Sequence, residues 1–488
     1  FNRIQCADMR GWSGDLDAPG WRKVAASVAD LVSAKGDFLV AKAPAQARKL
    51  SICVLPFANM SGDAEQEYFS DGISEDVITD LSKVSALDVT ARNSAFTFKG
   101  KSIKVTEVAR ELNVSHVLEG SVRKAGNRVR ITAQLIDGDT GNHLWAERYD
   151  RDLDDIFALQ DEISEAIVKA LKLKLLPEEK QAIERRGTDS PEAYDLYLMA
   201  RQYRWASNFS VSQNEAVVRL TSRAVGVDPS YAHAWALMAS AQASLRFRFG
   251  RQDIDSWTAV DKALALDPDL AEAHAAKSGN LRGEGRYDEA WEEAQIAMRL
   301  DPESHEANYA AAGVCFSQGR IADAIPFWEK SEALIETDVS SPAMLVTCYT
   351  ALGDTNGARR AARMALARAE AILAHDRSNG MAMGYGAGCL AVLGEADRCR
   401  DWIRRALLID PDNQNMRYNF ACDLGTHLKD TDGALELLGP YLAQVTPSEL
   451  AWTKVDPDMD AVRDDPRFQS MIAAAEARLA AEESQMAT

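Results

Sequence analysis

The sequence has 488 residues, of which 46% are hydrophobic and 26% charged, with a formal net charge of −19. This length allows about two to four domains of ordinary globular composition. No run approaches the roughly 18 apolar residues that a membrane span needs. Most of the negative charge lies in residues 187–488, which carry −16 of the total. An acidic surface of that size disfavours nucleic acid and anionic membranes as partners.

Seven cysteines and seven histidines are scattered along the chain, with no CxxC pair, no HExxH motif and no close His/Cys cluster. Most of the cysteines lie in alanine-rich segments, where a thiol usually acts as a small buried hydrophobe. This pattern favours a reducing compartment over a disulfide framework. We therefore expect a cytoplasmic protein without disulfides, metal ligands or a bound cofactor.

Residues 1–35 predict a short strand, a loop and a helix whose apolar stripe is formed by Trp21, Val24, Val28 and Leu31. One strand and one helix cannot bury a core. We therefore interpret this segment as the C-terminal remnant of an upstream domain whose body is missing. Residues 36–50, GDFLVAKAPAQARKL, show no clear periodicity and are interpreted as a linker.

Residues 51–186 alternate between strand and helix signals. SICVLPF predicts a buried strand, and an apolar residue at every fourth position predicts a helix with one buried stripe, at Phe69, Ile73, Val77 and Leu81. HVLEGSVRK and RVRITAQLI flank AGN, which predicts a hairpin. The second hairpin strand alternates apolar residues with Arg128, Arg130, Thr132 and Gln134, so one face is expected to be buried and the other wet. We predict a small α/β domain here.

Residues 187–450 lose the strand signals and repeat a set of landmarks. Gly285, Gly319 and Gly353 are spaced by 34 residues, and Gly394 follows. Small residues stand five and twelve positions after each glycine, and Asp-Pro pairs close several units. A period of about 34 residues with these landmarks is typical of tetratricopeptide repeats. We predict about six helix pairs, followed by C-terminal capping helices at 451–488. The fold class is thus α+β multidomain, with a small α/β domain before an all-α superhelix.

Stacked helix pairs create a concave groove that suits an extended peptide or a partner helix. The alternative is a solenoid used for self-assembly, including a homo-oligomer, or for holding another domain of the same chain. Candidate groove contacts on the inner helices are aromatic, Asn and Arg residues: Asn308, Tyr309, Tyr385, Arg417, Tyr418 and Asn419. No catalytic residue is predicted.

The stretch VLPFANMSGDAEQEYFSDGISEDVITDLS at 54–82 has the strand, glycine loop and helix order of many nucleotide sites. Its loop carries acids but no Lys or Arg, and the chain has neither GxGxxG nor GxxxxGK[ST]. A divalent-cation site at Asp63, Glu65 and Glu67 lacks the calcium-loop pattern. Acids at a helix N-terminus, favoured by the helix dipole, explain the stretch better. The basic cluster Arg123, Lys124, Arg128 and Arg130 is interpreted as a wet strand face.

The segment from ICVLPFANMSGDAEQEYFSDGISEDVITDLS through VTARNSAFTFKGK to LWAERYDRDLDDIFALQDEI resembles the TolB amino-terminal-like α/β module of bacterial regulators. That module typically precedes tetratricopeptide repeats and stands behind class III adenylate cyclase, CadC-type winged-helix or TIR domains. The resemblance implies an architecture and brings no catalytic residues. WTKVDPDMDAVRDDPRF at 452–468 is similar to the usual end of such proteins.

The first 35 residues resemble the last strand, loop and helix of bacterial TIR domains. The matching residues are Ile4, Gln5, Asp8, Trp12, Gly14, Asp15, Pro19 and Trp21. The resemblance implies an upstream effector that cleaves NAD or assembles, with its catalytic residues outside the given sequence.

We therefore expect a regulatory, protein-binding segment of a bacterial signalling protein that controls an upstream effector. The alternative is that the intact protein is an NAD-cleaving TIR enzyme, or less favourably an adenylate cyclase or transcription regulator, with this chain as its control arm.

Overall fold

The computed structural model describes residues 50–184, 187–206, 211–335, 337–375, 377, 379–409, 411 and 413–486. The predicted upstream remnant, with its TIR-like residues, and the predicted linker up to residue 49 lie outside these ranges. Among the described residues, no helix combines the length and the apolar character that a membrane crossing requires.

The N-terminal part is built on a mixed sheet. Its strands are β1 (Leu50–Val54), β2 (Ala58–Asn59), β3 (Leu87–Val89), β4 (His116–Ala125), β5 (Arg128–Asp137) and β6 (His143–Asp152), as the structure describes them. The order is β3-β1-β4-β5-β6, with β2 also pairing with β4. Strand β1 runs parallel to β3 and β4, whereas β4, β5 and β6 form an antiparallel meander. The predicted hairpin is β4–β5.

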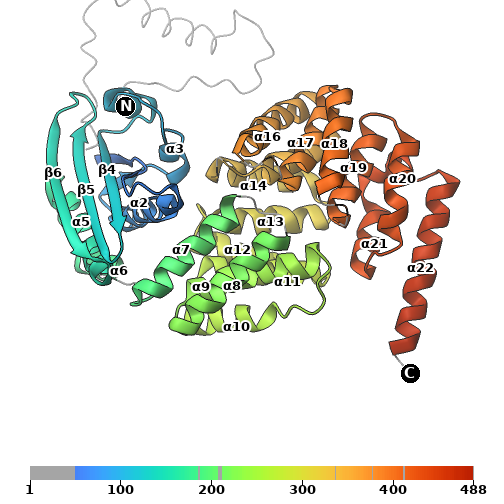
Figure 1. Ribbon diagram of the computed structural model, residues 1–488, viewed down its shortest axis with the longest axis horizontal. Coiled ribbons are helices and arrows are strands. Elements are labelled where there is room, and N and C mark those ends of the chain that lie inside the picture. The colour runs from blue at the N-terminus through green and yellow to red at the C-terminus, as the bar shows by residue number, and fades with distance from the viewer. Residues whose placement is uncertain are drawn as a thin grey trace, which may run out of the picture. The chain divides into compact units, whose positions relative to one another are not determined.

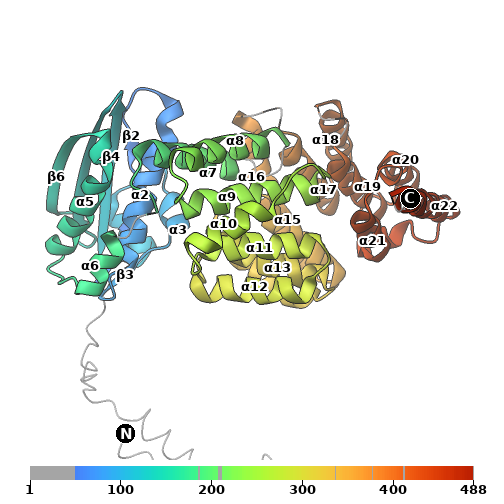
Figure 2. The ribbon, with the colours of Figure 1, turned by 90° about the horizontal axis from the view of Figure 1, so that it is seen from below.

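Helices complete this α/β part. They are η1 (Ala64–Gln66), α2 (Glu67–Ser82), α3 (Arg92–Phe96), α4 (Val105–Glu111), η2 (Leu153–Asp155), α5 (Ile156–Ala170) and α6 (Pro177–Glu184). Helices α2 and α5 pack against each other and against the sheet (Figure 2). The predicted stripe Phe69, Ile73, Val77 and Leu81 is buried, and the apolar residues of β5 are buried beside exposed Arg128 and Arg130. Both sequence predictions are confirmed.

Helix pairs follow one another through the rest of the chain (Figure 1). Among the described residues the pairs are α7 (Pro191–Ala206) with α8 (Val211–Val227), α9 (Ala232–Ala243) with α10 (Trp257–Leu266), α11 (Ala271–Gly283) with α12 (Tyr287–Leu300), α13 (His305–Ser317) with α14 (Ile321–Leu334), α15 (Ser340–Ala351) with α16 (Thr355–His375), α17 (Gly380–Leu393) with α18 (Ala396–Ile409), and α19 (Gln414–Thr426) with α20 (Thr431–Leu442). A π-helical turn, η3 (Ser244–Arg248), extends α9. Helix α21 (Pro447–Val455), the turn η4 (Pro457–Ala461) and α22 (Pro466–Met486) end the chain.

The repeat landmarks have clear structural roles. The glycines that mark the period, Gly285, Gly319, Gly353 and Gly394, all have positive φ, between 73° and 86°. They stand where the first helix of a pair ends, a backbone conformation that side chains disfavour. The small residues that follow them, among them Ala290, Ala324 and Cys399, are fully buried between helices. The structure therefore shows a helical-repeat domain of the tetratricopeptide type after a small mixed sheet.

Helix α7 joins the two parts. Its Tyr194 and Leu198 belong to the core of the α/β part, whereas Ala193 and Leu196 belong to the first core of the repeats. Gly72 of α2 gives Leu198 its room, since a Cβ at Gly72 would lie 2.6 Å from a Leu198 methyl carbon. Asp195 accepts hydrogen bonds from Tyr68 Oη at 2.9 Å and from Lys124 Nζ at 2.7 Å.

A buried ion cluster lies in the same contact. Glu75 of α2, 7% exposed, pairs with Arg92 of α3 and with Arg201 of α7. Transferring charged groups from water into the protein costs free energy, and the attraction between the carboxylate and the guanidinium groups offsets that cost. Removing the carboxylate would leave the cost without this offset. The cluster therefore ties the docking of α7 to the ionised state of one side chain.

We expect Glu75→Gln to lower the free energy of unfolding by about 3–5 kcal/mol, because it removes a buried carboxylate that pairs with two partly buried guanidinium groups. Urea denaturation followed by circular dichroism measures this change. Glu192→Gln is the matched control, since the Arg223–Glu192 pair has side chains 69% and 55% exposed and should contribute at most about 1 kcal/mol. Equal losses in the two variants would contradict the structural role of Glu75.

Candidate functional site

A cavity of about 450 Å³ lies along the repeats. The first helices of successive pairs supply most of its lining, from α9 through α11, α13, α15 and α17 to α19. Small residues contribute to this lining, including Ala275, Gly279, Gly313 and Gly388. A Cβ built on Gly279 would meet no atom within 4 Å. The repeat pattern thus puts small residues both where helices cross and where the first helices face the cavity.

Four of the six residues predicted as groove contacts line this cavity: Tyr309, Tyr385, Tyr418 and Asn419. The other two do not line it. The amide of Asn308 is buried and donates to the carbonyls of Pro302 at 3.0 Å and Ser304 at 2.8 Å, so it holds the start of α13. The guanidinium of Arg417 donates to the carbonyl of Pro411. Contact of any of the six with a ligand stays a prediction.

One end of the cavity carries charges of both signs. Arg204 and Arg282 line it together with Glu272 and Glu306. The Arg282 guanidinium lies over Gly313, where a Cβ would collide with it. Burial, together with the charge of Glu306, raises the pKa of Glu272 to about 7. This end of the cavity therefore carries two cations and two carboxyl groups of this chain.

The opposite end is formed by α19, α21 and η4, and it is acidic. Asp456 is buried there and accepts hydrogen bonds from Tyr418 Oη at 2.7 Å, Trp452 Nε1 at 3.1 Å and the backbone N–H of Asp458 at 2.9 Å. Three donors satisfy this carboxylate, which makes it a structural anchor for the segment after α21.

Asp423 and Asp458 line the same end, and their carboxyl groups differ from that of Asp456. Neither carboxyl accepts a hydrogen bond or forms an ion pair with any residue that the structure describes. Burial raises the pKa of Asp423 well above its usual value, and the charge of Asp458 adds to this shift. Burial, with the charges of Asp456 and Asp460, raises the pKa of Asp458 to about 7.

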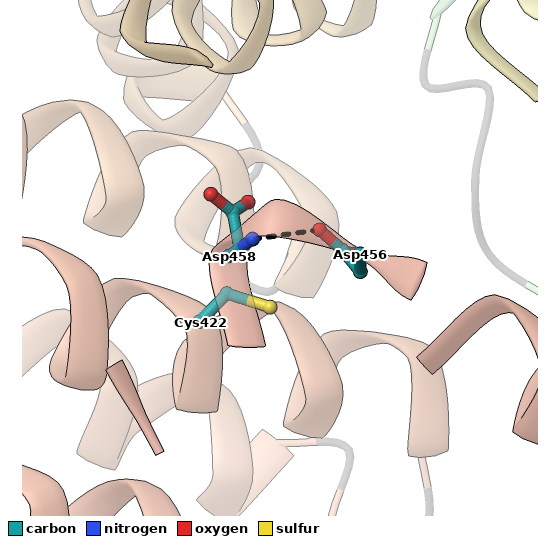
Figure 3. A group of neighbouring side chains, drawn as sticks. All are labelled: Cys422, Asp456 and Asp458. Atoms are coloured by element: carbon teal, nitrogen blue, oxygen red, sulfur yellow. Dashed lines mark hydrogen bonds between the residues drawn. The ribbon is translucent and has the colours of Figure 1, made fainter. Parts of the chain in front are cut away.

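Cys422, Asp456 and Asp458 bring one thiol and two carboxylates within 4.8 Å of one another (Figure 3). Metal ligands must be deprotonated, but burial raises the pKa of the Cys422 thiol well above its usual value. Asp456 is already occupied by the three donors above. The donor set therefore fits a metal ion poorly.

Other sequence candidates have local partners. Lys99 pairs with Glu67 at 2.9 Å and with Asp71 at 2.6 Å, so part of the acidic stretch at 54–82 is neutralised within the α/β part. In the basic cluster, Arg130 Nε donates to Asp150 Oδ2 at 2.9 Å and Arg123 Nε to the carbonyl of Met60 at 2.9 Å. These contacts agree with the interpretation of the acidic stretch as a helix N-terminus and of the basic cluster as a wet strand face.

The sequence analysis did not predict the cavity acids or Trp328 as part of this site. Trp328 is 2% exposed, lines the cavity and packs edge-on against Tyr309 with ring centroids 4.7 Å apart. Its indole N–H has no acceptor among the described residues. Their position in the repeat could have indicated these acids. Glu272, Glu306 and Asp423 all lie on the first helices of pairs, as the predicted groove contacts do.

The comparisons with known proteins concern parts of the chain. The family model of the HilA/YgeH-like transcriptional regulator, second domain, matches residues 47–166. A protein of Rhizobium meliloti (strain 1021) named "Putative adenylate cyclase 3" is 53% identical over 209 residues, which make up 43% of this chain and 34% of that protein. The chain thus spans only about a third of the length of this curated relative.

Solved helical-repeat proteins resemble the chain more distantly. YrrB, described as a TPR protein with an unusual peptide-binding site, is 19% identical with a TM-score of 0.25, over 40% of this chain and 95% of its own. Cut9 with Hcn1, an APC/C hetero-tetramer, gives 14% identity and a TM-score of 0.41, over 66% of this chain and 63% of that one. At these values the likenesses carry no functional argument, and the repeat assignment rests on the helix pairs themselves.

We expect Asp423→Asn to stabilise the protein more at pH 7.5 than at pH 5. The folded chain keeps the Asp423 proton up to its raised pKa, whereas the unfolded chain releases it near the ordinary value, so wild-type stability falls as pH rises between the two. Each unit of pKa shift corresponds to about 1.4 kcal/mol, or roughly 2–4 °C in Tm.

Thermal unfolding at both pH values measures the effect. Asp432→Asn is the matched control, because this side chain on α20 is 86% exposed and its replacement should change Tm little at either pH. A Tm gain for Asp423→Asn that is equal at both pH values, or a loss, would contradict the burial of an unpaired carboxyl.

Proposed function

We propose that this chain is the regulatory, protein-binding segment of a signalling protein, and that its repeats bind an extended peptide or protein segment. The observation that carries the proposal is the cavity along the first helices of the pairs. Its lining combines aromatic side chains, glycines and a few charged groups. Ligand sites commonly combine apolar walls with a few polar groups that fix the ligand's orientation.

The contact through α7 supports an effect of ligand binding in the cavity on the α/β part. Burial lowers the pKa of Arg201, and the charges of Glu306 and Glu272, which line the cavity, oppose that shift. The same arginine pairs with Glu75 of α2. A ligand that changes the charge balance at this end would bias how firmly α7 holds the α/β part, which is a population shift.

The effector that such a segment controls is a further part of the proposal. The relative named as an adenylate cyclase and the match to a transcriptional regulator domain support a regulatory setting for the α/β part, which resembles the TolB amino-terminal-like module. The cyclase-named relative favours a nucleotide cyclase as the effector of a longer protein. A TIR domain that cleaves NAD is the alternative drawn from the first 35 residues.

Panning a phage-displayed library of random linear dodecapeptides on the 488-residue chain tests the binding proposal. We expect selected peptides whose affinity falls at least about tenfold in Gly279→Trp, because the new ring occupies the cavity. Isothermal titration calorimetry with a synthetic peptide measures the affinity.

Gly226→Trp is the matched control. Gly226 lies on α8 away from the cavity, and a Cβ there also meets no atom within 4 Å. Peptides that bind Gly279→Trp and Gly226→Trp equally well, or failure to select any peptide, would contradict the proposal and favour a scaffold or a homo-oligomer.

A further inference from the structure

The two ends of the cavity differ in the charges that this chain supplies. Arg204 and Arg282 stand beside Glu272 and Glu306 at one end, whereas Asp423 and Asp458 at the other face no lysine or arginine among the described lining residues. The Asp423 carboxyl lies against the backbone of α17, where a Cβ at Gly388 would be 2.6 Å from Asp423 Oδ1. The acidic end is therefore lined by carboxyls without a lysine or arginine among the described lining residues.

Aromatic rings border the acidic end. Trp452 stacks on Phe316 with centroids 5.2 Å apart and planes at 28°. Tyr418 and Tyr441 lie 4.9 Å apart, centroid to centroid, and all four rings line the cavity. Ring faces beside carboxylates attract an organic cation through its charge and its alkyl stem together.

The indole N–H of Trp328 indicates which other group the ligand carries. Trp328 lines the same cavity, and its buried indole N–H lacks an acceptor among the described residues. A buried donor without an acceptor is costly. A peptide carbonyl supplies such an acceptor, whereas a bare metal ion or a simple amine does not.

We propose that the acidic end, between Asp423 and Asp458, receives a lysine or arginine side chain of the bound peptide. This specificity rests on the proposed peptide-binding function. The peptide main chain continues along the cavity past Trp328 toward the end that carries Arg204 and Arg282. Charge complementarity then fixes the direction in which the peptide lies, since its basic residue is disfavoured at the end that already holds two arginines.

Binding of the basic side chain is coupled to proton release. The raised pKa values of the two carboxyls mean that the free protein keeps protons there, and a bound cation favours their ionised forms. The groups around the pair are Asp456 just before η4, Asp460 on η4, Tyr418, Cys422 and His427 at α19, Lys429 after α19, Cys348 on α15, Cys389 on α17, Cys399 on α18, Tyr441 on α20 and Glu449 on α21. Burial lowers the pKa of His427 to about 4, so it stays neutral near pH 7.

The test compares a selected peptide with its analogue in which the lysine is replaced by norleucine, or the arginine by citrulline. For wild type we expect enrichment of a basic residue during panning and at least about tenfold weaker binding of the analogue. Asp423→Asn and Asp458→Asn should remove this discrimination, whereas Asp460→Asn should keep it. Affinity for the basic peptide, and not for its analogue, should rise between about pH 6 and about pH 8.

The outcomes separate the two proposals. If peptides bind and Gly279→Trp blocks them, but no basic residue is enriched or the analogue binds equally well, the cavity binds peptides and the basic-residue specificity is overturned. Discrimination that persists in the Asp423→Asn, Asp458→Asn double variant overturns it too. Tight zinc binding by wild type that Asp458→Asn abolishes, with zinc displacing the peptide, would assign the acidic end to a metal. If no peptide is selected, both proposals fail.

Discussion

Helix α7 is the element on which the arrangement of this protein depends, because it belongs to two cores. Its Leu198 fits over Gly72 of α2, and its Arg201 reaches Glu75 in a buried ion cluster. The opposite face of α7 starts the stack of helix pairs. A helix shared in this way cannot shift against one core without disturbing the other, because closely packed interiors transmit strain. The packing of α7 therefore connects the first helix pair to the α/β part.

Small residues serve two purposes in the repeats. Those at the helix crossings, such as Ala290 and Ala324, are fully buried and allow close approach of the helices. Two glycines on the cavity side differ in what they make room for. Gly279 leaves open space, whereas Gly388 makes room for the carboxyl group of Asp423. The same composition thus produces tight packing between pairs and an opening along the first helices.

The two ends of the cavity carry different charges, and this difference determines which ligand the proposed binding function would favour. The Arg282 end carries arginines beside its glutamates, whereas the acidic end has no lysine or arginine among its described lining residues. Desolvation raises the pKa values of Asp423 and Asp458 there. Titratable groups with strongly perturbed pKa values in cavities are concentrated at functional sites. Asp456 differs from these two residues, because its carboxylate accepts hydrogen bonds from three donors and therefore has a structural role.

The sequence alone determined the elements and their order. The period of 34 residues, the glycines at helix ends and the four-residue stripe of α2 reflect local geometry, which neighbouring residues dictate. Four of six predicted groove residues line the cavity for the same reason, since position on a first helix can be read from the repeat. The pairing of Glu75 with Arg201 and the meeting of Asp423 with Asp458 were decided by tertiary structure only. These partners are far apart in sequence, and burial and charge act through space, so no local pattern records which side chains they bring together.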